Sequence, residues 1–101
     1  MILTVDIGNT NIMLGGFEGD ELTFVARVST DPLKTEDEYA SILLNTLALH
    51  GVDKAEIKGA ILSSVVPPLN AVIKKAIAFL HGVEPLTVGP GIKTGINIHC
   101  D

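Results

Sequence analysis

The residues with the clearest chemical potential lie near the start of the chain, in the segment Asp6-Ile7-Gly8-Asn9-Thr10-Asn11. A carboxylate at the end of a strand can hold Mg²⁺ directly or through water. A glycine two residues later lets the backbone approach an anion closely. The amides that follow, the Thr10 hydroxyl and the two asparagine side chains can donate hydrogen bonds to phosphoryl oxygens. The spacing therefore predicts a phosphate-binding turn, with an ordinary hairpin turn as the alternative, because Asp, Gly and Asn are common in turns.

The same segment excludes two other kinds of phosphate site. A Walker loop requires Gly-Lys-Ser/Thr, and no such sequence follows. Chemistry that phosphorylates an aspartate uses a second aspartate two residues later, and Gly8 occupies that position. We therefore expect Asp6 to act on the metal side of a phosphate and not as a phosphorylated nucleophile.

Hydrophobic patterning predicts the elements that position this segment. Three strands, at residues 2–5, 12–17 and 22–28, form an antiparallel meander, and Leu22 alternates in phase with Phe24 in the third. A capping box from Thr35 to Glu38 begins a helix that ends before Gly51. A strand at 57–63, a helix with prolines 67 and 68 in its first turn, and strands at 86–88 and 96–100 complete the chain.

The order β-β-β-α-β-α-β predicts an α/β fold. Its mixed sheet combines the three-stranded antiparallel meander with parallel strands, and helices lie on the sheet. A length of 101 residues suits one domain. The last strand pattern continues to Asp101 without a polar tail, so we expect residues 1–101 to be one domain of a larger protein.

Composition and charge narrow the classes of partner. The chain is 47% hydrophobic and 19% charged, which is typical of a globular domain, and its net charge of -5 argues against binding to nucleic acid or to an anionic membrane. No apolar run reaches the ~18 residues of a membrane span, and the N-terminus does not match a signal peptide. A single cysteine fits a reducing cytoplasm.

The segment from Asp6 to Asn11 resembles the first phosphate motif of the acetate-and-sugar-kinase, Hsp70 and actin superfamily. In its Asn9-Thr10-Asn11 version it resembles the type III pantothenate kinases. The similarity extends over essentially the whole chain. It continues in Arg27–Thr30 followed by Thr35–Tyr39, in Ser63–Pro67, and in Gly89–Gly91 through Thr94-Gly95.

The resemblance implies a ribonuclease-H-like (actin-like ATPase) fold, in which two such domains enclose the active site. It also implies ATP-dependent phosphorylation of pantothenate to 4′-phosphopantothenate, the first step of coenzyme A biosynthesis, by a cytoplasmic homodimer that uses Mg²⁺ and a monovalent cation, K⁺ or NH₄⁺. By the same resemblance Asp6 lies on the Mg²⁺ side of the nucleotide-binding residues, which are Asp6, Ile7, Gly8, Asn9, Thr10, Asn11, Ile12 and Met13.

Two departures from the family pattern bear on activity. The family's catalytic base belongs to a Gly-Ala-Asp-Arg motif just beyond the equivalent of Asp101, so the chain holds no catalytic residue, and the second domain is missing. Cys100 stands where relatives usually have a tyrosine that contacts pantothenate, which makes it a candidate substrate-binding residue. Because phosphoryl transfer requires a closed cleft, we expect the 101 residues alone to be inert.

Two alternative functions stay open at this point, an accessory transcriptional regulator without kinase activity and a different small-molecule kinase of the superfamily. The remaining polar residues are expected to have structural roles. No two histidines have the spacing of zinc ligands, and Arg27 is expected to pair with an acid more readily than to face the nucleotide. The resemblance alone places residues 89–95 at the pantothenate-side rim.

Overall fold

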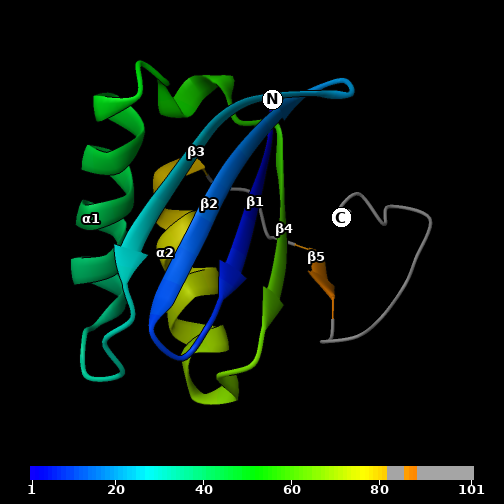
Figure 1. Ribbon diagram of the computed structural model, residues 1–101. Coiled ribbons are helices and arrows are strands. Elements are labelled where there is room, and N and C mark those ends of the chain that lie inside the picture. Colours follow the sequence, from blue (N-terminus) through cyan, green and yellow to red (C-terminus); the bar gives the residue numbers. More distant parts are fainter. Residues whose placement is uncertain (82–85, 89–101) are drawn as a thin grey trace.

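The computed structural model describes residues 1–81 and 86–88, which form a five-stranded sheet with two helices (Figure 1). The strands are β1 (Ile2–Ile7), β2 (Asn11–Glu18), β3 (Glu21–Ser29), β4 (Gly59–Ser64) and β5 (Leu86–Val88). The helices are α1 (Glu36–Leu49) and α2 (Asn70–His81), and short 3-10 helices span Lys54–Glu56 and Pro67–Leu69. Neither helix in the described part combines the length and hydropathy needed to cross a membrane.

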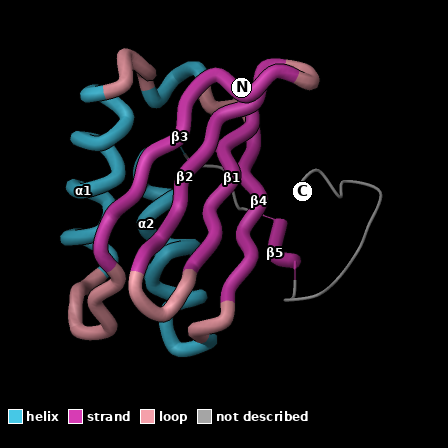
Figure 2. The backbone as a smooth tube through the Cα atoms, viewed as in Figure 1, coloured by secondary structure: helices cyan, strands magenta, loops and turns pink. Residues whose placement is uncertain are grey.

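The strand order in the sheet is β3-β2-β1-β4-β5 (Figure 2). β1 pairs antiparallel with β2, and β2 with β3, because short turns connect them. β4 pairs parallel with β1 and β5, and in each case a helix makes the return crossing. The predicted meander, parallel strands and element order are confirmed, while the predicted strand at 96–100 and the helix end at Gly82 lie outside the described residues.

The core lies between one face of the sheet and the two helices, which pack against that face and against each other (Figure 1). Alternate strand residues and helix residues spaced by three or four meet there, as the periods of strand and helix require. The fully buried members include Leu3, Val5, Ile7, Ile12, Leu14, Tyr39, Leu43, Leu47, Leu62, Ile73 and Ile77. The opposite face of the sheet leaves Ile2, Met13 and Val25 exposed by 37% to 50%.

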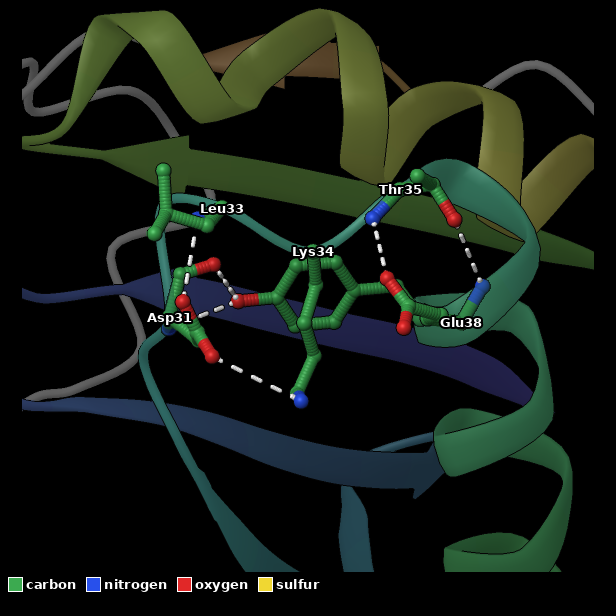
Figure 3. Close-up of polar contacts among 6 residues, drawn as sticks. Asp31, Leu33, Lys34, Thr35 and Glu38 are labelled. Atoms are coloured by element: carbon green, nitrogen blue, oxygen red, sulfur yellow. Dashed lines mark hydrogen bonds and ion pairs between the residues drawn. The ribbon is translucent and has the colours of Figure 1, made fainter.

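Both ends of α1 match the prediction. The Thr35 hydroxyl accepts from the Glu38 amide at 3.2 Å, and the Glu38 carboxylate accepts from the Thr35 amide at 2.8 Å (Figure 3). At the other end Gly51 adopts a φ of 74°, where glycine is favoured, and the Val52 amide donates to Leu47 O at 2.9 Å. Local sequence therefore sets the length of this helix.

Three local predictions were wrong in detail. The fourth strand begins at Gly59 and not at 57, because the Ile57 amide closes a 3-10 turn on Lys54 O instead of pairing in the sheet. Prolines 67 and 68 form a separate 3-10 helix before α2, closed by the Leu69 amide on Val66 O. In β3 a register shift follows the pair Gly16–Phe24, so Leu22 leaves the buried face and is 49% exposed.

Candidate functional site

The turn between β1 and β2 is closed by its own backbone. The Gly8 amide donates to Asn11 O at 2.9 Å. A Cβ added at Gly8 would lie 3.0 Å from that same oxygen, which is close enough that the turn would have to give by a few tenths of an ångström. Glycine at this position therefore permits the tight reversal that follows Asp6.

Thr30, directly after β3, holds the turn from the neighbouring strand. Its hydroxyl donates to Gly8 O at 2.8 Å, and its amide donates to Thr10 O at 2.9 Å. These two bonds engage carbonyl groups on both sides of Asn9. The turn is thus tied to the sheet through residues 22 positions away in the chain.

The loop that carries Thr30 is itself fixed by helix α1. The fully buried Tyr39 donates its hydroxyl proton to Asp31 O at 2.7 Å and accepts from the Asp31 amide at 2.8 Å. The Asp31 carboxylate accepts from the Leu33 amide at 3.0 Å and lies 3.5 Å from Lys34 Nζ (Figure 3). A continuous set of hydrogen bonds therefore links the helix core to the turn.

The amides of Asn9 and Thr10 point to the chemistry of the turn. Both residues are exposed, and neither amide has a hydrogen-bond acceptor within the described ranges. Together with the Thr10 hydroxyl they present donors to solvent where β1 ends and β2 begins. Such neighbouring donors match the oxygens of a bound anion such as a phosphate.

Asp6 lies one residue before the end of β1, on the sheet face that the helices leave open. It is exposed, and its Cα partners are Met13 on β2 and Ser63 on β4. Ser63 donates its hydroxyl proton to Asp6 Oδ1 at 3.1 Å. Sequence patterning assigned Ser63 no contact with Asp6, because only the parallel register brings these residues together across 57 positions.

The predicted nucleotide-binding residues divide into two groups. The side chains of Ile7 and Ile12 are fully buried in the core, so they anchor the two ends of the turn. The others reach solvent: Asp6, Asn9 and Thr10 are exposed, Gly8 and Asn11 are half-buried, and Met13 is 37% exposed. The candidate substrate contact Cys100 and the predicted rim at 89–95 lie outside the described residues.

The Asp6 carboxylate takes part in no ion pair within the described ranges, and no cluster of three metal-ligating side chains occurs there. The predicted pairing of Arg27 with an acid is not found among the described residues. Arg27 is exposed, and its Cα partner on β2 is Met13. Because Met13 is also the Cα partner of Asp6, Arg27 and Asp6 lie in the same cross-strand row.

Comparison with known proteins gives a match over nearly the whole chain. A family model described as type III pantothenate kinase matches residues 2–101. Proteins named type III pantothenate kinase are 49% identical over 98 residues in Brevibacillus brevis, 46% over 101 residues in Geobacter sulfurreducens and 52% over 96 residues in Finegoldia magna. These alignments cover 97%, 100% and 95% of this chain, but only 38%, 40% and 37% of the relatives.

Two solved structures share the fold. A ROK hexokinase from Thermus thermophilus aligns with a TM-score of 0.64 and 16% identity, over 87% of this chain and 34% of its own. RuvC from Thermus thermophilus aligns with a TM-score of 0.53 and 18% identity, over 88% of this chain and 63% of its own. These alignments confirm the ribonuclease-H-like (actin-like ATPase) fold predicted for the chain.

Proposed function

The chain belongs to the type III pantothenate kinase family, and from that premise we propose that the full-length gene product transfers a phosphoryl group from ATP to pantothenate. The product is 4′-phosphopantothenate, which makes this the first step of coenzyme A biosynthesis. The observation that carries the proposal is the braced turn, in which two exposed amides without acceptors in the described ranges follow the exposed Asp6 by three and four residues. The family names of the relatives, at 46% to 52% identity, support the choice of substrate.

The residues of the turn fit a nucleotide that carries Mg²⁺. Proteins usually bind Mg²⁺ through one or two carboxylates, with water and substrate phosphates as the other ligands. Asp6 offers one carboxylate, and the amides of Asn9 and Thr10 in the turn that follows β1 are available to hold phosphoryl oxygens. When bound, the cation neutralises charge on the transferred phosphoryl group.

The chain spans about 40% of the length of these relatives. We therefore propose that residues 1–101 supply the N-terminal domain of a two-domain cytoplasmic enzyme that acts as a homodimer. The catalytic base and the site for K⁺ or NH₄⁺ belong, in this proposal, to the remaining length, and Cys100 lines the pantothenate pocket. One wall of a cleft positions only part of the reacting system, so the 101 residues alone are expected to be inert.

The test compares two charge-neutralising variants of the full-length gene product. Asp6→Asn removes the metal-side carboxylate and is expected to lower pantothenate phosphorylation at least about 100-fold. Asp20→Asn removes an equal charge from the exposed turn between β2 and β3, and is expected to leave the rate unchanged. Phosphopantothenate is measured by mass spectrometry and ADP by a coupled assay. A wild-type protein without this activity, or a fully active Asp6→Asn variant, would refute the proposal.

A further inference from the structure

The hydrogen bond from Ser63 to Asp6 joins two strands that are distant in sequence. Asp6 and Ser63 are Cα partners in the parallel pairing of β1 with β4, so their side chains leave the sheet on the same open face. Ser63 is half-buried and Asp6 is exposed. Among the described residues this is the single side-chain hydrogen bond that the Asp6 carboxylate accepts.

The other neighbour of Asp6 offers no such contact. Met13, its partner on β2, carries a thioether, which cannot donate a hydrogen bond. Of the two side chains that flank Asp6 in the sheet, only Ser63 can therefore restrain its carboxylate. The bond engages Oδ1 and leaves Oδ2 without a partner among the described residues.

The strand that carries Ser63 is itself well anchored. β4 lies between β1 and β5, and the Val65 amide continues the pairing by donating to Ile7 O at 3.0 Å. The neighbouring Ser64 hydroxyl accepts from the Val66 amide at 2.9 Å, which closes the turn after the strand. A single torsion places the oxygen of a serine side chain, so on such a strand the Ser63 hydroxyl is a well-placed donor.

We propose that Ser63 is a positioning residue for the metal-side carboxylate. Its hydroxyl holds one oxygen of Asp6, so that the other oxygen stays available to a cation that arrives with the nucleotide, or to the water of that cation. Carboxylates that ligate metals are commonly oriented by such outer hydrogen bonds. This inference rests on the proposed function, because it assigns Ser63 to the same nucleotide site.

The experiment uses two variants of the full-length gene product at Ser63 whose new side chains are isosteric with each other. Ser63→Thr keeps the hydroxyl and Ser63→Val replaces it with a methyl group, and both side chains are β-branched and suit a strand. Calorimetry measures the affinity for a non-hydrolysable ATP analogue, once with Mg²⁺ and once with EDTA. Ser63→Val is expected to weaken binding about three- to tenfold with Mg²⁺ and to leave binding in EDTA unchanged. Ser63→Thr is expected to bind like the wild type in both conditions.

Thr4 provides a matched control on β1, the strand of Asp6, and on the same face of the sheet as Asp6 and Ser63. It lies two residues before Asp6, and its hydroxyl donates to Gly15 O at 3.4 Å. Thr4→Val therefore removes a hydroxyl of the same size from the neighbouring cross-strand row. This variant is expected to keep the wild-type affinity with and without Mg²⁺.

The outcomes separate the two proposals. If the wild type binds the analogue more tightly with Mg²⁺ and Ser63→Val behaves identically, or loses equal affinity in EDTA, the positioning of Asp6 by Ser63 is refuted while the kinase proposal stands. If the wild type shows no effect of Mg²⁺, the proposed site and this inference both fail. A measurement on the wild type keeps the inference testable if the variants do not fold. In NMR spectra, Mn²⁺ bound with the analogue is expected to broaden the amide signal of Ser63 more than that of Thr23. Equal broadening of the two signals would overturn the inference.

Discussion

Removal of the Tyr39 hydroxyl tests the bracing of the candidate site by helix α1. Tyr39 is fully buried, and its hydroxyl both donates to Asp31 O and accepts from the Asp31 amide, at 2.7 and 2.8 Å. Tyr39→Phe keeps the ring and therefore the packing, but it leaves the Asp31 amide without a partner and leaves Asp31 O with only the 3.4 Å bond from the Lys34 amide. The variant isolates the two hydrogen bonds from the rest of the core.

The expected loss of stability follows from these two bonds. Each is worth about 1 kcal/mol net, which gives a decrease of about 2 kcal/mol in the free energy of unfolding. For a domain of this size such a change lowers Tm by about 8–16 °C. The Thr30 amide, which donates to Thr10 O next to the freed loop, is also expected to exchange its hydrogen faster.

Urea unfolding of the 101-residue chain, followed by circular dichroism, measures this change. Lys34→Ala is the control, because it removes the ion pair to Asp31 from the same loop while both Tyr39 bonds remain. That pair is 3.5 Å long and its side chains are 34% and 41% exposed, so the expected loss is about 0.5 kcal/mol or less. Bracing of the loop by Tyr39 is refuted if Tyr39→Phe is as stable as the wild type, or if Lys34→Ala lowers the free energy of unfolding by as much as Tyr39→Phe.

Two further variants test the turn and the sheet that supports it. Thr30→Val removes the 2.8 Å bond to Gly8 O and is expected to weaken the binding of an ATP analogue to the full-length gene product about three- to tenfold. The control is Thr23→Val, which removes a 3.1 Å bond to Gly16 O at the far end of β3 and is expected to leave this affinity unchanged. Equal effects of these two variants would contradict the bracing of the turn by Thr30. Gly16→Ala is expected to lower the unfolding free energy of the 101-residue chain by about 1–3 kcal/mol in urea, because its new methyl group would overlap the Phe24 ring. A stability equal to the wild type would show that the ring moves aside freely.

Much of the site was predictable because its signals are local. Asp6 near the end of β1 and Gly8 in the turn that follows are two residues apart, and their residue types alone indicate a strand end and a tight reversal. The register shift in β3 was not predictable from alternation, because the twist and pairing with β2 decide which residue is displaced. Arg27 shows the same limit: its charge suggested an acidic partner, but the sheet places it in a row with Met13 instead.

Local sequence signals are enough to indicate the α-helices and strands of the described part of the chain and their order. The capping box at Thr35 marks the start of helix α1, and the left-handed Gly51 marks its end. Short turns require the first three strands to be antiparallel. Each of these signals acts within a few residues. Which side chains meet around the turn depends instead on how the strands pair in the folded sheet. The Ser63 hydroxyl reaches Asp6, and Thr30 reaches Gly8, through strand pairings that join residues 57 and 22 positions apart. Such contacts depend on register across the whole sheet, which no local pattern specifies.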